Sequence, residues 1–128
     1  MDETLDVIII GGGPAGLTAA LYTSRARLNT LVLEKTKIGG QITLTHEIAN
    51  YPGAIMGSDE EPSGVELTAR MKEQAEKFGA KFELQKEVVK VDFDGDIKYL
   101  ETQDGEKYQA KSIIIATGAT PREIGCPG

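Results

Sequence analysis

The stretch Asp6-Val-Ile-Ile-Ile-Gly11-Gly-Gly13-Pro14-Ala15-Gly16 determines how this chain begins to fold. Its apolar run, residues 7–10, predicts a buried parallel strand, and three glycines follow with the spacing Gly-x-Gly-x-x-Gly. In this spacing Gly11 permits the tight turn from strand to helix, Gly13 lets a pyrophosphate approach the backbone, and Gly16 lets the helix pack closely on the strand. The stretch therefore predicts a strand, a turn and a helix that bind a dinucleotide.

The helix after the glycines is expected to run from about Pro14 to Arg27. Proline suits the first helical turn, because its missing N–H would have no partner there. The free N–H groups at Ala15 and its neighbours lie at the positive end of the helix dipole, which favours bound phosphate. Asn29 is expected to take the left-handed conformation that follows the helix end.

Glu34 is the predicted contact of this fold with a ribose. It follows a second predicted strand, Thr30 to Leu33, about 20 residues beyond the glycines. A carboxylate at this place can accept hydrogen bonds from both hydroxyls of an adenosine ribose, and it would repel a 2′-phosphate. NADP is therefore disfavoured as the ligand of this fold, while FAD and NAD both remain open. A glycine-rich turn that binds no nucleotide is the simpler alternative.

Composition limits the partners and the compartment. The chain has 128 residues, enough for about one domain. It carries 14 basic and 20 acidic residues, a net charge of −6, which argues against nucleic acid or an anionic membrane surface as a partner. The first apolar run, about five residues long, is too short for a signal peptide or a membrane-spanning helix. The single cysteine cannot form an internal disulfide, which fits the cytoplasm.

A long irregular segment and a second helix are expected next. Residues 35–62 show no sustained period, and so long a loop inside a compact domain is usually functional. We expect its first half to wrap a ligand and its second half, 57–62, to be solvated surface. Ser63 and Glu66 form a capping box that opens a helix. Its core-facing residues at helical spacing are Leu67, Met71, Ala75 and Phe78, and Gly79 ends it.

The remaining pattern predicts strands. Residues 80–84 complete a βαβαβ unit, and Asp-Gly turns at 94–95 and 104–105 separate alternating segments that predict a three-stranded antiparallel meander. Its apolar side is expected to hold Val89, Val91, Phe93, Ile97 and Tyr99. Residues 112–116 predict one more buried strand. The fold class is therefore α/β, a Rossmann-like fold of three layers with a parallel sheet and an antiparallel meander.

Three segments carry a resemblance to a known family. They are residues 11–16, residues 39–53 with Gly39-Gly40-Gln41-Ile42 at the start and Asn50-Tyr-Pro-Gly53 at the end, and Ala116-Thr117-Gly118-Ala119. Together they resemble the FAD-binding half of the flavoprotein disulfide reductases, and among these the low-molecular-weight bacterial thioredoxin reductases. The middle segment is the most diagnostic, because in this family it wraps the flavin.

The resemblance implies FAD as the cofactor and assigns residues to it. It places Gly11, Gly13, Pro14, Ala15 and Gly16 at the pyrophosphate, Glu34 and Lys35 at the adenosine, and the Val88 backbone at the adenine. It places Gly39, Gly40, Gln41 and Asn50 at the isoalloxazine and ribityl chain, and Ala116, Thr117 and Gly118 where the chain passes the cofactor. The amides of Gln41 and Asn50 can both donate and accept hydrogen bonds, which suits a flavin edge.

The resemblance also implies that this domain is incomplete. In the family the chain continues into an NADPH-binding domain with a Cys-x-x-Cys pair, and then returns to add a strand and a helix to the FAD domain. Residues 1–118 would then be the N-terminal portion of the FAD-binding domain, and 119–128 a linker. We expect no catalytic residue here, because Cys126 has no second cysteine beside it. The strand at 113–115 is expected to present an unpaired apolar edge.

Three functions remain open from the sequence. The first is the FAD-binding part of an enzyme that passes electrons from NADPH through FAD to a dithiol and on to thioredoxin or a similar disulfide protein, inactive as this piece alone. The second is a stand-alone module that binds a flavin or an adenine nucleotide. The third is part of a related flavoenzyme, a thioredoxin-reductase-like ferredoxin–NADP reductase or a peroxiredoxin-reducing flavoprotein. A homodimer or another self-association is expected.

Overall fold

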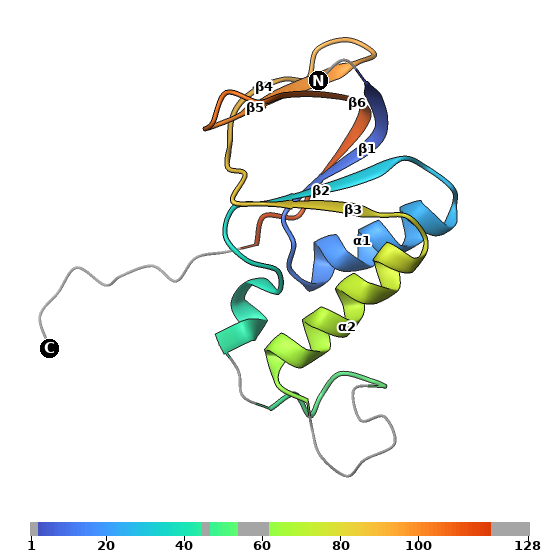
Figure 1. The fold of residues 1–128 in the computed structure, drawn as a ribbon, viewed down its shortest axis with the longest axis vertical. Coiled ribbons are helices and arrows are strands. Elements are labelled where there is room, and N and C mark those ends of the chain that lie inside the picture. Colours follow the sequence, from blue (N-terminus) through green and yellow to red (C-terminus); the bar gives the residue numbers. More distant parts are fainter. Residues whose placement is uncertain (1–2, 45–46, 54–61, 119–128) are drawn as a thin grey trace, which may run out of the picture.

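Residues 3–44, 47–53 and 62–118 are described by this computed structural model. Within them the strands form one six-stranded sheet in the order β3-β2-β1-β6-β5-β4 (Figure 1). The strands are β1 (Thr4–Ile10), β2 (Thr30–Glu34), β3 (Lys81–Leu84), β4 (Val88–Asp92), β5 (Lys98–Thr102) and β6 (Lys107–Ile115). The helices are α1 (Pro14–Arg25) and α2 (Gly64–Lys77), and the 3-10 helix η1 spans Gly40–Leu44.

The described residues form three layers. Helices α1 and α2 cover one face of β1, β2 and β3, while β4, β5 and the start of β6 curl over the opposite face (Figure 1). Ile8 and Ile9, neighbours on β1 and both fully buried, pack into the two different interfaces. Because the parallel strands are covered on both sides, they read as continuous apolar runs rather than alternating ones. The predicted three-layer α/β class is confirmed.

The ends of the first three elements differ from the sequence prediction. Strand β1 begins at Thr4, earlier than the apolar run, because Thr4 and Leu5 pair with Gln109 and Ala110 of β6. Helix α1 ends at Arg25 rather than Arg27. The left-handed residue that follows it is Arg27, with φ +64°, and not Asn29, so the prediction for Asn29 is wrong.

Asn29, the residue before β2, instead forms hydrogen bonds with β1. Its carbonyl oxygen accepts from the N–H groups of Asp6 and Val7, and its own N–H donates to the Asp6 carboxylate at 2.7 Å. These three bonds hold the start of β2 beside β1.

Helix α2 begins where the capping box predicts. The Ser63 hydroxyl accepts from the Glu66 N–H at 3.1 Å, and Lys77 is the last helical residue. Leu67 and Ala75 are buried, but Phe78 is exposed, so its predicted core position is wrong. Phe78 instead lies under the Arg25 guanidinium of α1, 5.8 Å from the ring centre.

The meander exists, but its strands differ in two ways from the prediction. The third meander strand and the predicted strand at 112–116 are one continuous strand, β6, which pairs with β5 over 107–110 and with β1 over 109–115. In addition, Val89, Val91 and Tyr99 are exposed, so their predicted place on the apolar side is wrong. Strand β4 is the edge strand, has a register shift between Val88 and Lys90, and is exposed at every residue after Val88. Leu100 and Tyr108 form the buried side instead.

Pro62, expected on solvated surface, is buried, and its carbonyl oxygen accepts from the Ile48 N–H. The rest of the segment predicted as solvated, 57–61, lies outside the described residues, as does the predicted linker 119–128 with Cys126.

Candidate functional site

Backbone atoms leave no room for a side chain at two of the glycines after β1, Gly11 and Gly16. A Cβ atom on Gly11, which has φ +117°, would lie 2.0 Å from the carbonyl oxygen of Ala116. A Cβ on Gly16 would lie 1.9 Å from the carbonyl oxygen of Gly11. Neither contact can be relieved by a side chain moving away, since the obstructing atoms belong to the backbone. The predicted roles of these two glycines in the turn and in close packing are therefore visible in the structure.

Gly13 differs from its neighbours because the protein leaves space beside it. A Cβ on Gly13 would meet Gly39 and Gly40 only at ordinary contact distances of 3.7 Å or more, and a Cβ on Gly40 would lie 3.4 Å from the Cα of Gly13. Gly13 is the N-cap of α1 and provides no side-chain cap for the helix. The two glycine segments thus face each other across the first turn of α1 without side chains between them. We call this space the glycine cradle.

A hydrogen bond holds the two walls of the cradle together. The Gly39 N–H donates to the Gly12 carbonyl oxygen at 2.8 Å. Gly39, with φ +114°, also packs against the buried Thr68 of α2, because a Cβ there would lie 2.7 Å from the Thr68 hydroxyl. Helix α2 therefore supports the segment that begins η1.

Glu34 lies at the carboxyl end of β2 and is 8% exposed. One carboxylate oxygen accepts from the Gly12 N–H at 2.8 Å, and the other accepts from the Thr36 N–H at 2.6 Å and from the Thr36 hydroxyl at 3.2 Å. Glu34 therefore connects the glycine turn with the chain that leads to η1.

The segment after β3 lies beside Glu34. The Lys86 N–H donates to the Glu34 carbonyl oxygen, and the Lys35 ammonium lies 3.8 Å from the Glu87 carboxylate. The structure therefore brings Lys35 and the start of β4, where Val88 lies, to the same end of β2. Val88 itself is half-buried and packs against the core between the sheet and the meander.

The remaining candidate residues approach the glycine turn from two sides. After β6, the Ala116 N–H donates to the Ile10 carbonyl oxygen at 2.8 Å, which carries Thr117 and Gly118 past the start of the turn. On the other side, Gln41 lies in η1 and is exposed. Asn50 is also exposed and follows Ile48, which packs against Leu67 of α2. Contact of Asn50 with a ligand remains a prediction.

Three residues at the site were not among the predicted ones. Gly12 occupies a variable position of the Gly-x-Gly-x-x-Gly spacing, yet it bonds to both Glu34 and Gly39. Thr68 carries no local pattern, since its contact with Gly39 joins segments that lie far apart in the sequence. The bonds of Thr36 to Glu34 are local, but no known motif marks them. The triple glycine was the one signal that could have drawn attention to Gly12.

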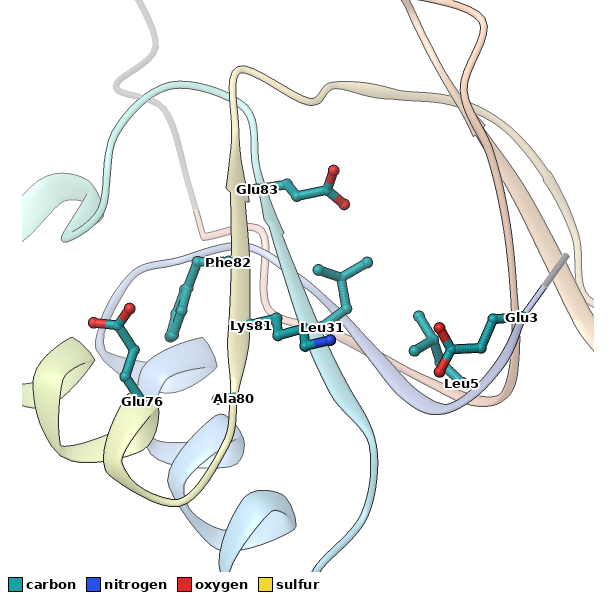
Figure 2. A pocket seen from close by; sticks show the side chains of 8 residues that line it. All are labelled: Glu3, Leu5, Leu31, Glu76, Ala80, Lys81, Phe82 and Glu83. Carbon is teal, nitrogen blue, oxygen red and sulfur yellow. The ribbon is translucent and has the colours of Figure 1, made fainter. Parts of the chain in front are cut away.

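A separate cavity of about 410 Å³ lies away from these residues. It surrounds the edge strand β3 near the amino ends of the strands, with Phe82 and Glu76 on the helix side and Leu5, Leu31 and Glu83 on the other (Figure 2). The candidate residues lie at the carboxyl ends of the same strands, where open α/β sheets bind ligands. We therefore do not assign the cavity to the site.

The described residues contain neither a metal-ligand cluster nor a membrane-spanning helix. Their carboxylates form no group of three or more that could hold a metal ion. None of the helices described is both long and apolar enough to cross a membrane.

Comparison with known proteins identifies the family. The model of the pyridine nucleotide-disulphide oxidoreductases matches residues 5–128. The chain belongs to this family. Residues 1–128 are 52% identical to a thioredoxin reductase from Peptoclostridium acidaminophilum, covering 100% of this chain and 39% of that protein. Identity to a thioredoxin reductase from Bacillus subtilis is 44%, over 99% of this chain and 38% of the relative.

Solved structures of family members agree with the fold. The Lactococcus lactis thioredoxin reductase in its FR conformation superposes with a TM-score of 0.86 at 44% identity, over 98% of this chain and 39% of that one. A thioredoxin reductase from Gloeobacter violaceus gives 0.82 at 39% identity, covering 98% and 38%. The chain thus spans about two fifths of the length of the family members that it matches.

Proposed function

We propose that this chain is the FAD-binding portion of a thioredoxin reductase. The observation that carries the proposal is the glycine cradle, which lies at the N-terminus of α1 and within one hydrogen-bonded unit with Glu34. A dinucleotide needs these two features together, a side-chain-free helix N-terminus for its pyrophosphate and a carboxylate for its ribose. The residues present therefore fit the adenosine diphosphate half of FAD.

Each residue would then have a definite task. The first turn of α1 would bind the pyrophosphate, Glu34 the ribose hydroxyls, and the chain near Lys35 and Val88 the adenosine. Gly39, Gly40, Gln41 and Asn50 would bind the flavin end, with Ala116–Gly118 beside it. FAD, when bound, would supply the group that accepts and donates electrons. The residues of this chain bind and orient it.

The activity of the longer protein is part of the same proposal. Electrons would pass from NADPH to FAD, then to a dithiol and to thioredoxin, in the cytoplasm. The names of the relatives support thioredoxin as the acceptor. The NADPH site and the dithiol would lie on other parts of the protein, so the 128-residue chain is expected to show no NADPH-dependent disulfide reduction by itself.

Gly13→Ala tests the cofactor assignment. Its Cβ would meet protein atoms only at 3.7 Å or more, and Gly13 has φ −81°, so the fold should tolerate it. The same Cβ would occupy the space proposed for the pyrophosphate. We expect Gly13→Ala to bind FAD at least about tenfold more weakly than wild type in a calorimetric titration, from the loss of close phosphate contacts.

The controls separate binding from folding. Thermal unfolding of ligand-free Gly13→Ala should occur within a few degrees of wild type, whereas Gly16→Ala, which meets a backbone oxygen at 1.9 Å, should be much less stable. Equal FAD affinity of wild type and Gly13→Ala would show that the pyrophosphate does not lie in the cradle.

A further inference from the structure

The Glu34 carboxylate already has most of its hydrogen-bonding capacity in use. A carboxylate has about four acceptor positions, two on each oxygen. One oxygen receives the Gly12 N–H, and the other receives both the N–H and the hydroxyl of Thr36. One position therefore stays open on the first oxygen, while the second oxygen is filled.

This count conflicts with the way Glu34 is expected to bind a ribose. The two neighbouring hydroxyls of a ribose would require two acceptor positions, and one is open. A donor must therefore leave when both hydroxyls bind. The Gly12 N–H is fixed by the turn, and the Thr36 N–H makes the shortest of the three bonds, 2.6 Å. The Thr36 hydroxyl makes the longest, 3.2 Å, and its hydrogen can turn to another acceptor about the Cβ–Oγ bond.

We propose that the Thr36 hydroxyl occupies the place of one ribose hydroxyl on Glu34 and competes with the nucleotide for it. Thr36 is thus a residue that sets the affinity of the site, and this role rests on the proposed function of Glu34. Thr36 is exposed, so its displaced hydroxyl can bond to water. The backbone bond between Thr36 and Glu34 stays in place, and the loop keeps its position while the ligand binds.

Thr36→Val is the variant that tests this competition, because it removes the hydroxyl and keeps the shape of the side chain. We expect ADP, titrated by calorimetry, to bind Thr36→Val about twofold to tenfold more tightly than wild type, the scale of one hydrogen bond that no longer has to be broken. Thr36→Ser keeps the hydroxyl and should bind ADP as wild type does. An affinity of Thr36→Val that is equal to or weaker than that of wild type overturns the proposal.

Deoxynucleotides identify the competing hydroxyl. If the Thr36 hydroxyl competes with the 2′-hydroxyl, the gain from Thr36→Val should disappear with 2′-deoxy-ADP; if it competes with the 3′-hydroxyl, the gain should disappear with 3′-deoxy-ADP. A gain that is the same for ADP and for both deoxynucleotides would arise from another cause and also overturns the proposal.

Glu34→Ala separates this test from that of the proposed function. Weaker ADP binding by Glu34→Ala, together with no gain in Thr36→Val, would contradict the role of Thr36 and keep Glu34 at the ribose. Equal binding of ADP by wild type and Glu34→Ala would remove Glu34 from the ribose and contradict both. Absence of ADP binding in wild type and Thr36→Val alike would also contradict both.

Discussion

Single atoms decide which glycines of the turn serve the fold and which serve the ligand. A Cβ atom on Gly11 or Gly16 would meet a backbone oxygen at about 2 Å, whereas one on Gly13 would come no closer than 3.7 Å to the backbone atoms of Gly39 and Gly40. The sequence shows the same residue type at all three positions. The distance to the nearest backbone atom separates the glycines that the fold requires from the one that it does not, and the Gly13→Ala experiment uses that separation.

A second feature at this scale is the buried hydroxyl of Ser24 on α1, which lacks a hydrogen-bond partner among the described residues. Its neighbour Thr23 is fully used, since its hydroxyl bonds to the Thr30 hydroxyl at 2.8 Å and to the Ala19 carbonyl oxygen. A buried hydroxyl without a partner costs stability, and alanine is also the better helix former.

Ser24→Ala should therefore leave the free energy of unfolding unchanged or raise it by up to about 1 kcal/mol. Thr23→Val, which removes a hydroxyl that has partners, should lower it by about 1 kcal/mol. Urea denaturation of the three proteins measures both changes. A loss of more than about 1 kcal/mol in Ser24→Ala would show that its hydroxyl has a partner after all.

At the scale of elements, the contact between β3 and the meander depends on Tyr108 of β6. Tyr108 is 2% exposed, and its hydroxyl is hydrogen-bonded to Glu83 of β3. Burial, together with the Glu83 charge, raises the pKa of Tyr108 to about 12. Beside it, the Lys86 ammonium and the Thr102 hydroxyl lower the pKa of Asp104 to about 2. Polar side chains therefore line one side of the interface between β3 and the meander, which is otherwise apolar.

Alkaline pH should weaken this junction. The folded-state pKa of Tyr108 lies above the ordinary value of 10.0, so its contribution is fully present below that pH and is lost as pH rises through about 12. Near pH 7, Tyr108→Phe should be less stable than wild type by about 0.5–1.5 kcal/mol, because the bond to Glu83 is lost. From about pH 10 upward the stability difference between wild type and Tyr108→Phe should shrink. The unfolded wild-type chain then loses the Tyr108 proton while the folded one keeps it, which favours unfolding, and Tyr108→Phe has no such proton to lose.

Denaturation of both proteins at several pH values measures this difference. A stability difference that stays constant up to pH 12 would mean that the Tyr108 phenol ionises equally easily in the folded and the unfolded state.

At the scale of the whole molecule, the edge strand β3 is protected from pairing, whereas part of the interior strand β6 is open on one side. Strand β3 is short and presents Lys81 and Glu83, charges that discourage pairing with another strand. Strand β6 extends beyond β5, so within the described residues its backbone over 112–115 pairs only with β1. Ile115 there is 66% exposed. Among the residues that the structure describes, this stretch therefore forms the unpaired apolar edge that was predicted.

We expect the 128-residue chain to self-associate through this edge and to retain FAD less well than a longer protein that supplies another strand. Light scattering at increasing protein concentration should show the association. Ile115→Lys should reduce it without loss of stability, because the side chain is mostly exposed. Val65→Lys, which makes the same change on α2 at 54% exposure, should not reduce it. A chain that stays strictly monomeric and keeps stoichiometric FAD through gel filtration contradicts this expectation.

Elements whose causes are local could be predicted from the sequence. An apolar run followed by Gly-x-Gly-x-x-Gly, a capping box at Ser63 and two Asp-Gly turns each act through neighbours in the chain, and each was found where predicted. The three-layer α/β class followed from these patterns together, whereas the family followed from the resemblance of residues 11–16, 39–53 and 116–119. The assignment of individual residues to FAD remains a prediction.

Features that depend on contacts between distant segments became visible in the structure alone. Val89 and Val91 lie on the outside of the meander, and pairing with β1 joined two predicted strands into β6. The bond of Glu34 to Gly12 likewise became visible when the glycine turn and the end of β2 met. The local sequence determines which helix, strand or turn a segment can form, because caps, turns and helical hydrogen bonds join residues that are close in the chain. The face it buries and the atoms it meets depend on the strands packed beside it.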